Sequence, residues 1–195
     1  MRHVCAFFHG EEEAYRILLP FVAEGFAAGE KAIHIVPPHR HGEHRARLRE
    51  RGIDVEAALA GGQLDLRSTI DTYLPDGRFD GERMLRSFTA MAEEKQGYPL
   101  SRIVCDMDWA SGARPAMTDL IAFEARVNEL WSRHDDVVIC VYDAGKLSGD
   151  MVIDIIRTHP MVLIGDSLQE NPFFVPPDRY IADAAGPHGA GGGAP

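Results

Sequence analysis

Short runs of apolar residues alternate along this chain with longer segments in which apolar residues recur every three or four positions. Six of the runs are long enough for buried strands: residues 4–8, 32–36, 63–67, 101–109, 137–142 and 161–164. Strands that alternate with helices build a mostly parallel sheet with helices on both of its faces. The pattern therefore predicts an α/β fold, a three-layer sandwich around a mostly parallel central sheet.

The segments between these runs carry the period of amphipathic helices. Helices are expected over residues 11–28, 39–52, 53–60, 81–95, 115–133 and 148–158, with Ser148 as the N-cap of the last one. The basic helix over 39–52 is predicted to face solvent. Residues 165–177 are predicted to form an extended closing stretch in which Phe173 and Phe174 pack back on the body.

Composition limits the number of domains and the kinds of partner. A chain of 195 residues that is 45% hydrophobic allows one ordinary globular domain, predicted over 1–179, and the Gly/Ala/Pro-rich residues 180–195 are predicted to be a flexible tail. A net charge of −10 disfavours direct contact with nucleic acid or with an anionic membrane surface. The chain has no apolar stretch near the roughly 20 residues of a membrane helix, and its start leads directly into a strand, so a cytoplasmic location is expected.

The first turn of the chain is where an α/β protein would hold a ligand, because ligands lie outside the carboxyl ends of the strands. A phosphate-binding loop requires G-x-x-x-x-G-K-[ST] at this point, and the chain has HGEEEAYR instead. Three glutamates, Glu11 to Glu13, occupy the positive end of the helix that a triphosphate would need. The sequence therefore predicts no nucleotide cofactor and no ATPase activity.

Several sequence blocks follow one another in the order of a known family. They are HVCAFF, the helix with Glu13 and Tyr15 that leads to LLPF, GEKAIHIV, GRFDGERM, IVCDMDWA, FEARVNEL, CVYD and RTHPMVLIGDSLQENPFFVPP. Each block is a weak signal, but the ordered set, about 175 residues long, resembles the MEDS domain, a methanogen/methylotroph sensory domain named for a dichloromethane-responsive regulator. The resemblance implies a degenerate P-loop NTPase fold, similar to RecA and KaiC but without Walker A. It also implies a small-molecule sensor, often attached to DNA-binding or signalling partners, with simple hydrocarbon derivatives proposed as ligands.

The predicted ligand-binding residues gather at the strand ends and on one long helix. Apolar surface and a few polar anchors in a common pocket suit a small, partly apolar ligand. The set comprises Phe8, His9, Glu13, Tyr15, Asp106, Met107, Asp108, Trp109, Glu124, Asn128, Tyr142 and Asp143. For Asp106, Asp108 and Asp143 a loop-fixing role is an equal alternative, and Glu124 and Asn128 also fit a plain solvated helix edge.

Histidines and cysteines offer further chemistry that the sequence leaves without a site. His39, His41 and His44 have a spacing that metal sites use, but a basic helix start explains them, and no metal is expected. His3 and Cys5 point to one face of their strand, where a strand-start histidine and a buried thiol are the favoured interpretation, and His159 is predicted to cap a helix C-terminus. In a RecA-like strand order Cys5, Cys105 and Cys140 would align across the sheet as buried, non-catalytic thiols.

These observations favour a non-catalytic sensor domain that binds a small ligand and signals to a regulatory protein partner. The chain carries no helix-turn-helix, so direct DNA binding is not expected, while a homo-oligomer is compatible with the pattern. An interaction module in a kinase or anti-sigma-type pathway is the alternative, and a residual nucleotide-binding ATPase ranks third.

Overall fold

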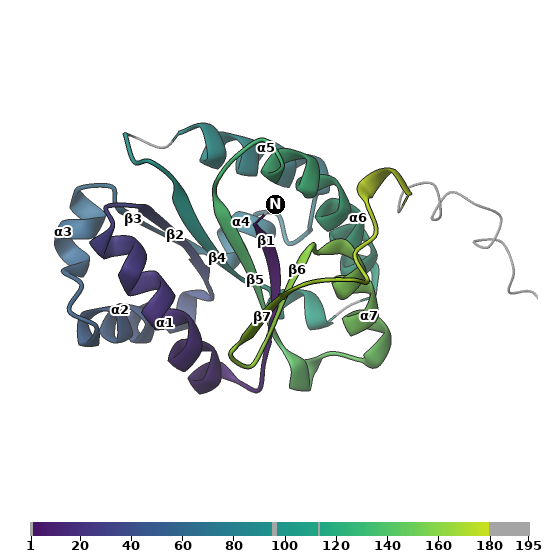
Figure 1. The fold of residues 1–195 in the computed structure, drawn as a ribbon, viewed down its shortest axis with the longest axis horizontal. Coiled ribbons are helices and arrows are strands. Elements are labelled where there is room, and N and C mark those ends of the chain that lie inside the picture. The colour runs from purple at the N-terminus through teal and green to yellow at the C-terminus, as the bar shows by residue number, and fades with distance from the viewer. Residues whose placement is uncertain (1, 95–96, 113, 180–195) are drawn as a thin grey trace, which may run out of the picture.

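A seven-stranded sheet forms the middle layer of the protein (Figure 1). The structure, a computed structural model, describes residues 2–94, 97–112 and 114–179. The sheet has the order β3-β2-β4-β5-β1-β6-β7, in which six strands are parallel and β7 runs antiparallel to β6. The strands are β1 (His3–Phe8), β2 (Lys31–Val36), β3 (Leu64–Ser68), β4 (Ser101–Asp106), β5 (Val137–Asp143), β6 (Met161–Ile164) and β7 (Ser167–Glu170).

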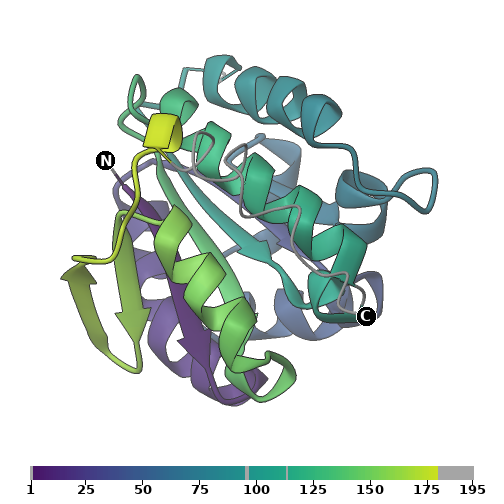
Figure 2. The ribbon, with the colours of Figure 1, turned by 90° about the vertical axis from the view of Figure 1, so that its right-hand side faces the viewer.

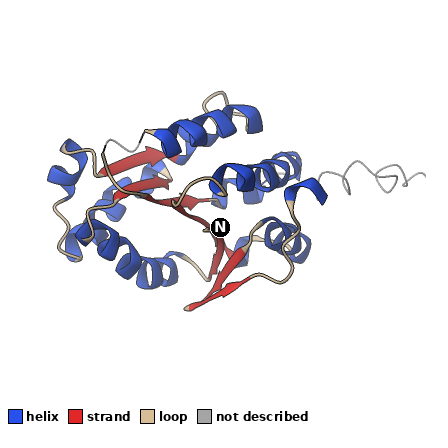
Figure 3. Cartoon of the chain, turned by 45° about the horizontal axis from the view of Figure 1, so that its top comes forward, coloured by secondary structure: helices blue, strands red, loops and turns tan. Residues whose placement is uncertain are grey.

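Helices cover both faces of this sheet, which makes the three layers visible in Figure 3. On one face lie α1 (Glu11–Ala27), α2 (His41–Glu50) and α3 (Val55–Ala60), and on the other α5 (Gly81–Glu93), α6 (Arg114–Trp131) and α7 (Gly149–Thr158). Shorter turns are α4 (Thr69–Tyr73), η1 (Pro38–Arg40), η2 (Asp108–Gly112) and η3 (Ala144–Lys146). Figure 2 shows α7 in front of the sheet, beside the β6–β7 hairpin.

Alternate residues of each central strand enter two different hydrophobic cores, because successive side chains of a strand point to opposite faces. In β1, Val4, Ala6 and Phe8 pack beneath α1, whereas Cys5 and Phe7 pack beneath the α5–α7 layer. Both faces are covered, so the strands read as continuous apolar runs, as buried parallel strands do. This division between the two faces decides which predicted site residues can meet.

The predicted alignment of the three thiols across the sheet is confirmed. Cys5 pairs in register with Cys140, and Cys140 pairs in register with Cys105. All three are buried and free. Burial raises the pKa of the Cys5 thiol far above its usual range, which keeps it protonated and unreactive.

The segment predicted as an extended closing stretch contains the strand β7, whose four residues are all exposed. Two local predictions need correction. Phe173, predicted to pack back on the body, is 69% exposed. The basic helix predicted to face solvent, α2, buries His44 and Leu48 against α1 and β2.

Two further predictions concern the C-terminal tail and membrane-spanning segments. The tail predicted over 180–195 lies outside the described residues. Within the described part of the chain, every helix is too short or too polar to cross a bilayer.

Candidate ligand-binding site at the strand ends

A small pocket of about 40 Å³ lies at the carboxyl ends of β1, β4 and β5. It collects five of the residues that the sequence assigned to ligand binding, Phe8, Asp106, Asp108, Tyr142 and Asp143. Gly10, Glu11, Ala14, Arg40 and Val141 complete its wall. The expected concentration of site residues at the strand ends is therefore found for these five.

Arg40, which the sequence analysis did not select, is a cation in the wall of this site. Its Nη1 donates to Asp106 Oδ2 over 2.9 Å, and its Nε lies 3.1 Å from Glu11 Oε2. Both Arg40 and Asp106 are largely buried. Burial and the nearby Asp108 raise the pKa of Asp106 to about 6, even though Arg40 acts in the opposite direction.

Asp108 and Asp143 hold the neighbouring loops in place. Asp108 Oδ1 accepts the backbone N–H of Asp143 over 3.1 Å, and Asp108 Oδ2 accepts from Lys146 Nζ over 2.5 Å. Asp143 Oδ1 accepts the N–H of Gly145 over 3.0 Å and so caps η3. The loop-fixing alternative thus describes the contacts of both carboxylates.

The glutamates at the start of α1 are engaged by neighbouring groups. Glu11 contacts Arg40, Glu12 forms an ion pair with Arg47, and Glu13 Oε2 accepts the backbone N–H of His9 over 2.6 Å. His9 and Glu13 line a different, open surface hollow between α1 and the end of α2. The predicted pocket does not include them.

A second cavity of about 60 Å³ lies between α1 and the sheet, next to the first. Arg40, Asp106, Ala14 and Val141 line both. Its wall is mostly apolar and is formed by Ala14, Leu18, Leu19, Val22, Ile35, Val36, Val104 and Val141, with Tyr15, His34, Arg40, His44 and Asp106 as polar groups. Tyr15 and Asp106 thus occupy pocket positions, as the sequence predicted.

A chain of hydrogen bonds joins Tyr15, His44 and His34 along this cavity. Tyr15 Oη lies 3.2 Å from His44 Nδ1, and His44 Nε2 lies 2.8 Å from His34 Nδ1. Burial, with the nearby Arg40, lowers the pKa of His44 to about 4. Burial, with the nearby His44, lowers the pKa of His34 well below its usual value. His34 Nε2 is buried without a hydrogen-bond partner among the described residues, so it is available to a small polar ligand.

His34 escaped the sequence analysis, although one signal was present. It is the sole polar residue inside the apolar run AIHIV, and a polar side chain within a buried strand needs a partner. Its neighbour His44 had been grouped with His39 and His41. The structure separates them, since His41 Nε2 donates to the carbonyl of Val36 over 3.0 Å while His44 turns inward.

Met107 and Trp109 were predicted to line the pocket, but they lie on the other face of the sheet. Met107 follows the pleat of β4 into the core beneath α5 and α6. Trp109, in η2, stacks on Tyr73 and Phe79 with ring centroids 4.9 and 5.2 Å apart. The strand was predicted to continue to Trp109, whereas β4 ends at Asp106. Successive side chains of a strand point to opposite faces, so Met107 lies on the face opposite Asp106.

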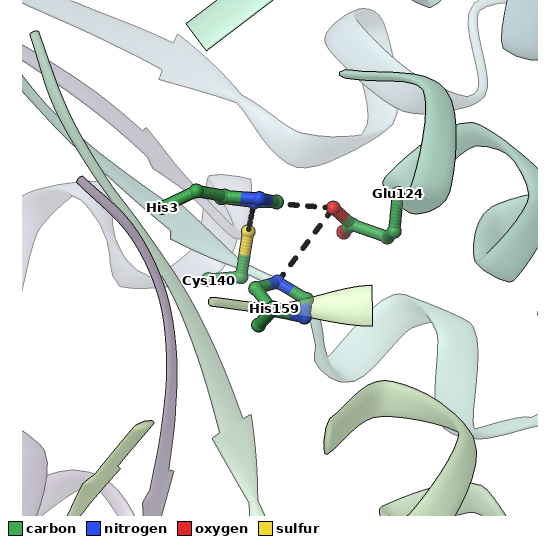
Figure 4. A group of neighbouring side chains, drawn as sticks. All are labelled: His3, Glu124, Cys140 and His159. Carbon is green, nitrogen blue, oxygen red and sulfur yellow. Dashed lines mark hydrogen bonds and ion pairs between the residues drawn. The ribbon is translucent and has the colours of Figure 1, made fainter. Parts of the chain in front are cut away.

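Glu124 and Asn128 also lie on that opposite face, away from the strand-end pocket, and their burial rules out the alternative of a solvated helix edge. Both are buried on α6. Glu124 lies among His3, Cys140 and His159 (Figure 4), and Asn128 Oδ1 lies 3.0 Å from His3 Nδ1. Burial acts to raise the pKa of Glu124, but His159 and His3 outweigh it and lower the pKa on balance. His159 caps the end of α7 as predicted, through a 2.8 Å contact between its Nδ1 and the carbonyl of Ile155.

Two solved structures align with most of this chain. A KaiC-like protein from Pyrococcus horikoshii aligns with a TM-score of 0.59 at 14% identity, over 83% of this chain and 70% of that one. The flagellar accessory protein FlaH from Methanocaldococcus jannaschii aligns with a TM-score of 0.54 at 15% identity, over 85% of this chain and 74% of that one. At these identities the likeness establishes the fold, and the RecA/KaiC-like architecture predicted from the sequence is confirmed.

Comparison of sequences gives the family. The transcriptional repressor DcmR of Methylorubrum extorquens is 24% identical over 158 residues, which is 80% of this chain and 57% of that protein. The chain thus spans little more than half of the length of that relative. The family model described as MEDS, the MEthanogen/methylotroph, DcmR Sensory domain, matches residues 2–160. As the sequence resemblance indicated, this chain belongs to the MEDS family of sensory domains.

Proposed function

We propose that this protein is a non-catalytic sensor domain whose ligand binds in the cavity between α1 and the sheet. The observation that carries the proposal is the mostly apolar 60 Å³ cavity with His34 Nε2 unpartnered in its wall. A water molecule needs about 10–15 Å³ of such volume, so the cavity has room for a ligand of about four non-hydrogen atoms. The chemistry fits a small, partly apolar molecule with one hydrogen-bonding group.

The cavity is placed so that its contents can influence more than one element. Arg40 joins η1 to β4 through Asp106 and to α1 through Glu11. A ligand that competes for Arg40 or Asp106 would favour one arrangement of these elements over another, and a ligand shifts an equilibrium only through such differential contacts. In this proposal the Arg40 contacts convert ligand binding into a signal.

A lack of catalytic turnover is part of the proposal. The glutamates at the start of α1 place negative charge where a triphosphate would lie, and Arg40, a cation close to that end, is already shared by Glu11 and Asp106. Titration with ATP and Mg²⁺ followed by calorimetry should therefore give no binding up to millimolar nucleotide. Saturable nucleotide binding would contradict this part.

The ligand proposal is tested with a thermal-shift screen of small alcohols, halocarbons, amines and carboxylic acids. Ala14 lines both pockets from α1, so Ala14→Leu should fill them and abolish the shift caused by any active compound. Ala23→Leu is the matched control, because Ala23 lies on the same helix but lines a separate hollow near α3. An unchanged ligand response in Ala14→Leu, or no response of the native protein to any class, would contradict the proposal.

We also propose a protein partner, since the β6–β7 hairpin exposes apolar side chains at the edge of the sheet. Ile164 is 59% exposed and Leu168 is 56% exposed, and β7 has an unpaired edge that a strand of a regulatory protein or of a second copy can extend. Sedimentation analysis tests the second-copy version. Self-association that Leu168→Lys abolishes and Ile70→Lys, at a distant exposed site, leaves intact would support it. A monomer at all concentrations would leave only the hetero-partner version.

A further inference from the structure

Four potential metal ligands converge on the face of the sheet opposite the proposed ligand cavity. They are His3 at the start of β1, Glu124 on α6, Cys140 in β5 and His159 after α7 (Figure 4). One ligand atom from each lies within 4.8 Å of the others, and all four residues are buried. Among the described residues, no other group of three or more histidine, cysteine and acidic side chains comes together in this way.

The surrounding hydrogen bonds fix both imidazoles with a nitrogen lone pair directed into the group. His159 Nδ1 lies 2.8 Å from the carbonyl of Ile155, which only accepts, so Nδ1 carries the proton. His3 Nδ1 lies 3.0 Å from Asn128 Oδ1, and the Asn128 amide nitrogen donates to the carbonyls of Glu124 and Thr158. Asn128 Oδ1 therefore accepts from His3. In the neutral form of each ring, Nε2 is then the nitrogen without a proton.

Glu124 is held with one oxygen outside the group and one inside. Its Oε1 accepts from the hydroxyl of Tyr142 over 3.4 Å. Its Oε2 has no hydrogen-bond partner among the described residues, and the same holds for His159 Nε2. A buried carboxylate oxygen that faces imidazole lone pairs is costly unless a positive charge lies between them.

Three of the separations between these atoms are close to the edges of a zinc tetrahedron. With Zn–N and Zn–O bonds of about 2.0–2.2 Å and Zn–S of about 2.3 Å, neighbouring ligand atoms lie about 3.3–3.7 Å apart. Glu124 Oε2 lies 3.2 Å from His3 Nε2 and 3.7 Å from His159 Nε2, and Cys140 Sγ lies 3.5 Å from His3 Nε2. The widest pair, within 4.8 Å, has to close by about 1 Å.

We propose that His3, Glu124, Cys140 and His159 bind one Zn²⁺ in a closed four-coordinate site. Two imidazoles, a thiolate and a carboxylate suit zinc, whereas Mg²⁺ and Ca²⁺ take oxygen ligands. Binding transfers the Cys140 thiol proton to solvent, and the thiolate and carboxylate then cancel the two charges of the ion, so that the buried site is neutral. Asn128, Tyr142 and the carbonyl of Ile155 orient the ligands.

The site has a role that is separate from ligand sensing. Its ligands come from β1, β5, α6 and the junction between α7 and β6. An ion bound here would link α6 and the end of α7 to the central strands β1 and β5. Because the four protein ligands fill the tetrahedron, the ion has no open position for a substrate, and its contribution is to stability.

Metal content and cobalt spectroscopy test the proposal on the full chain. Protein made in zinc-supplemented medium should contain about one Zn²⁺ per chain by elemental analysis. Because the site is buried, metal-free protein is prepared by unfolding in denaturant with a chelator and is then refolded with Co²⁺. The expected result is a cobalt–thiolate charge-transfer band together with visible bands typical of tetrahedral Co²⁺, and a higher melting temperature with Zn²⁺ than without it.

Substitutions separate the site from general damage to the core. Cys140→Ser should abolish the charge-transfer band, and Glu124→Gln, which keeps the shape of the side chain, should lower zinc content at least about tenfold. Cys105→Ser is the matched control, because Cys105 is an equally buried thiol paired in register with Cys140, and it should retain full metal content. A native protein that binds no zinc and gives no cobalt–thiolate band would overturn the proposal whatever the variants do.

Discussion

Arg40 and Asp106 form a largely buried ion pair that joins the turn after β2 to the carboxyl end of β4, with 2.9 Å between Nη1 and Oδ2. The two residues are 66 positions apart in the chain. Their pair lines both strand-end pockets, so it links the stability of this edge of the sheet to whatever binds there. The first prediction follows from this contact.

Arg40→Gln should lower the free energy of unfolding by about 2–4 kcal/mol at pH 7.5, because it leaves the buried carboxylate of Asp106 without its cation. The loss should shrink at pH 5. The raised pKa of Asp106, about 6, means that the folded protein already protonates this group there, and a neutral Asp106 needs no counter-ion. Urea titrations at the two pH values measure both quantities.

Arg47→Gln is the control for this prediction. Arg47 also forms ion pairs with glutamates, Glu12 and Glu43, but at the surface. Its removal should leave the free energy of unfolding unchanged within error at both pH values. An equal effect of the two substitutions would show that the Arg40 pair is not specially important.

The His34–His44 pair should make the protein sensitive to mild acid. The folded-state pKa of His44 is about 4 and the unfolded value about 6.5, so protons bind preferentially to the unfolded chain between these values. Stability is therefore fully present above pH 6.5 and falls as the pH drops toward 4. From pH 7 to pH 5 His44 alone should remove about 2 kcal/mol, and His34, whose pKa is also lowered by burial, acts in the same direction.

His44→Gln tests this pH dependence while keeping a side chain that can hydrogen-bond Tyr15 and His34. The variant should lose about 2 kcal/mol less than the native protein between pH 7 and pH 5 in urea titrations. Asp106 acts in the opposite direction over this range, but it contributes equally to both proteins and cancels in the comparison. Parallel pH profiles for the two proteins would contradict the assignment of a neutral buried His44.

The sequence predicted the layers and the strand alternation because these depend on local patterns of apolar residues. The alignment of Cys5, Cys140 and Cys105 followed from the strand order and the equal depth of each cysteine in its strand. The Ser148 cap was equally local, since its hydroxyl accepts the N–H of Met151 over 3.4 Å. Such features need little knowledge of tertiary contacts.

The site was harder to predict because it depends on which face each side chain takes and on what packs above it. Asp106 and Met107 are adjacent in sequence, yet they enter different layers of the fold. Arg40 and His44 looked like members of a solvated basic helix, and only the packing of α2 on α1 turns them inward. The separations of 125 and 137 positions that join His3 to Asn128 and Cys140 leave no local signal.

Trp109→Leu should change stability without changing the response to ligand. Trp109 stacks on Tyr73 and Phe79 on the face away from the cavity, so its loss should cost about 2 kcal/mol through lost burial and ring contacts. The thermal shift caused by an active compound should keep the native size. Tyr15→Phe should reduce the thermal shift caused by compounds that hydrogen-bond the hydroxyl. Loss of the ligand response in Trp109→Leu would contradict the location of the ligand between α1 and the sheet.

The turn between β1 and α1 depends on a glycine rather than on a phosphate-binding sequence. Gly10 has φ of 81° and ψ of 177°, a backbone region that is almost restricted to glycine, although a Cβ at this position would meet no atom within 4 Å. Gly10→Ala should therefore lower the free energy of unfolding by about 1–3 kcal/mol through backbone strain alone.

Gly42, in α2, also has open space around its Cβ position but lies in a helix, so Gly42→Ala should raise the free energy of unfolding by about 0.5–1 kcal/mol. Denaturant titrations of the two variants should thus move in opposite directions, and a neutral Gly10→Ala would mean that the turn relaxes to a conformation open to other residues.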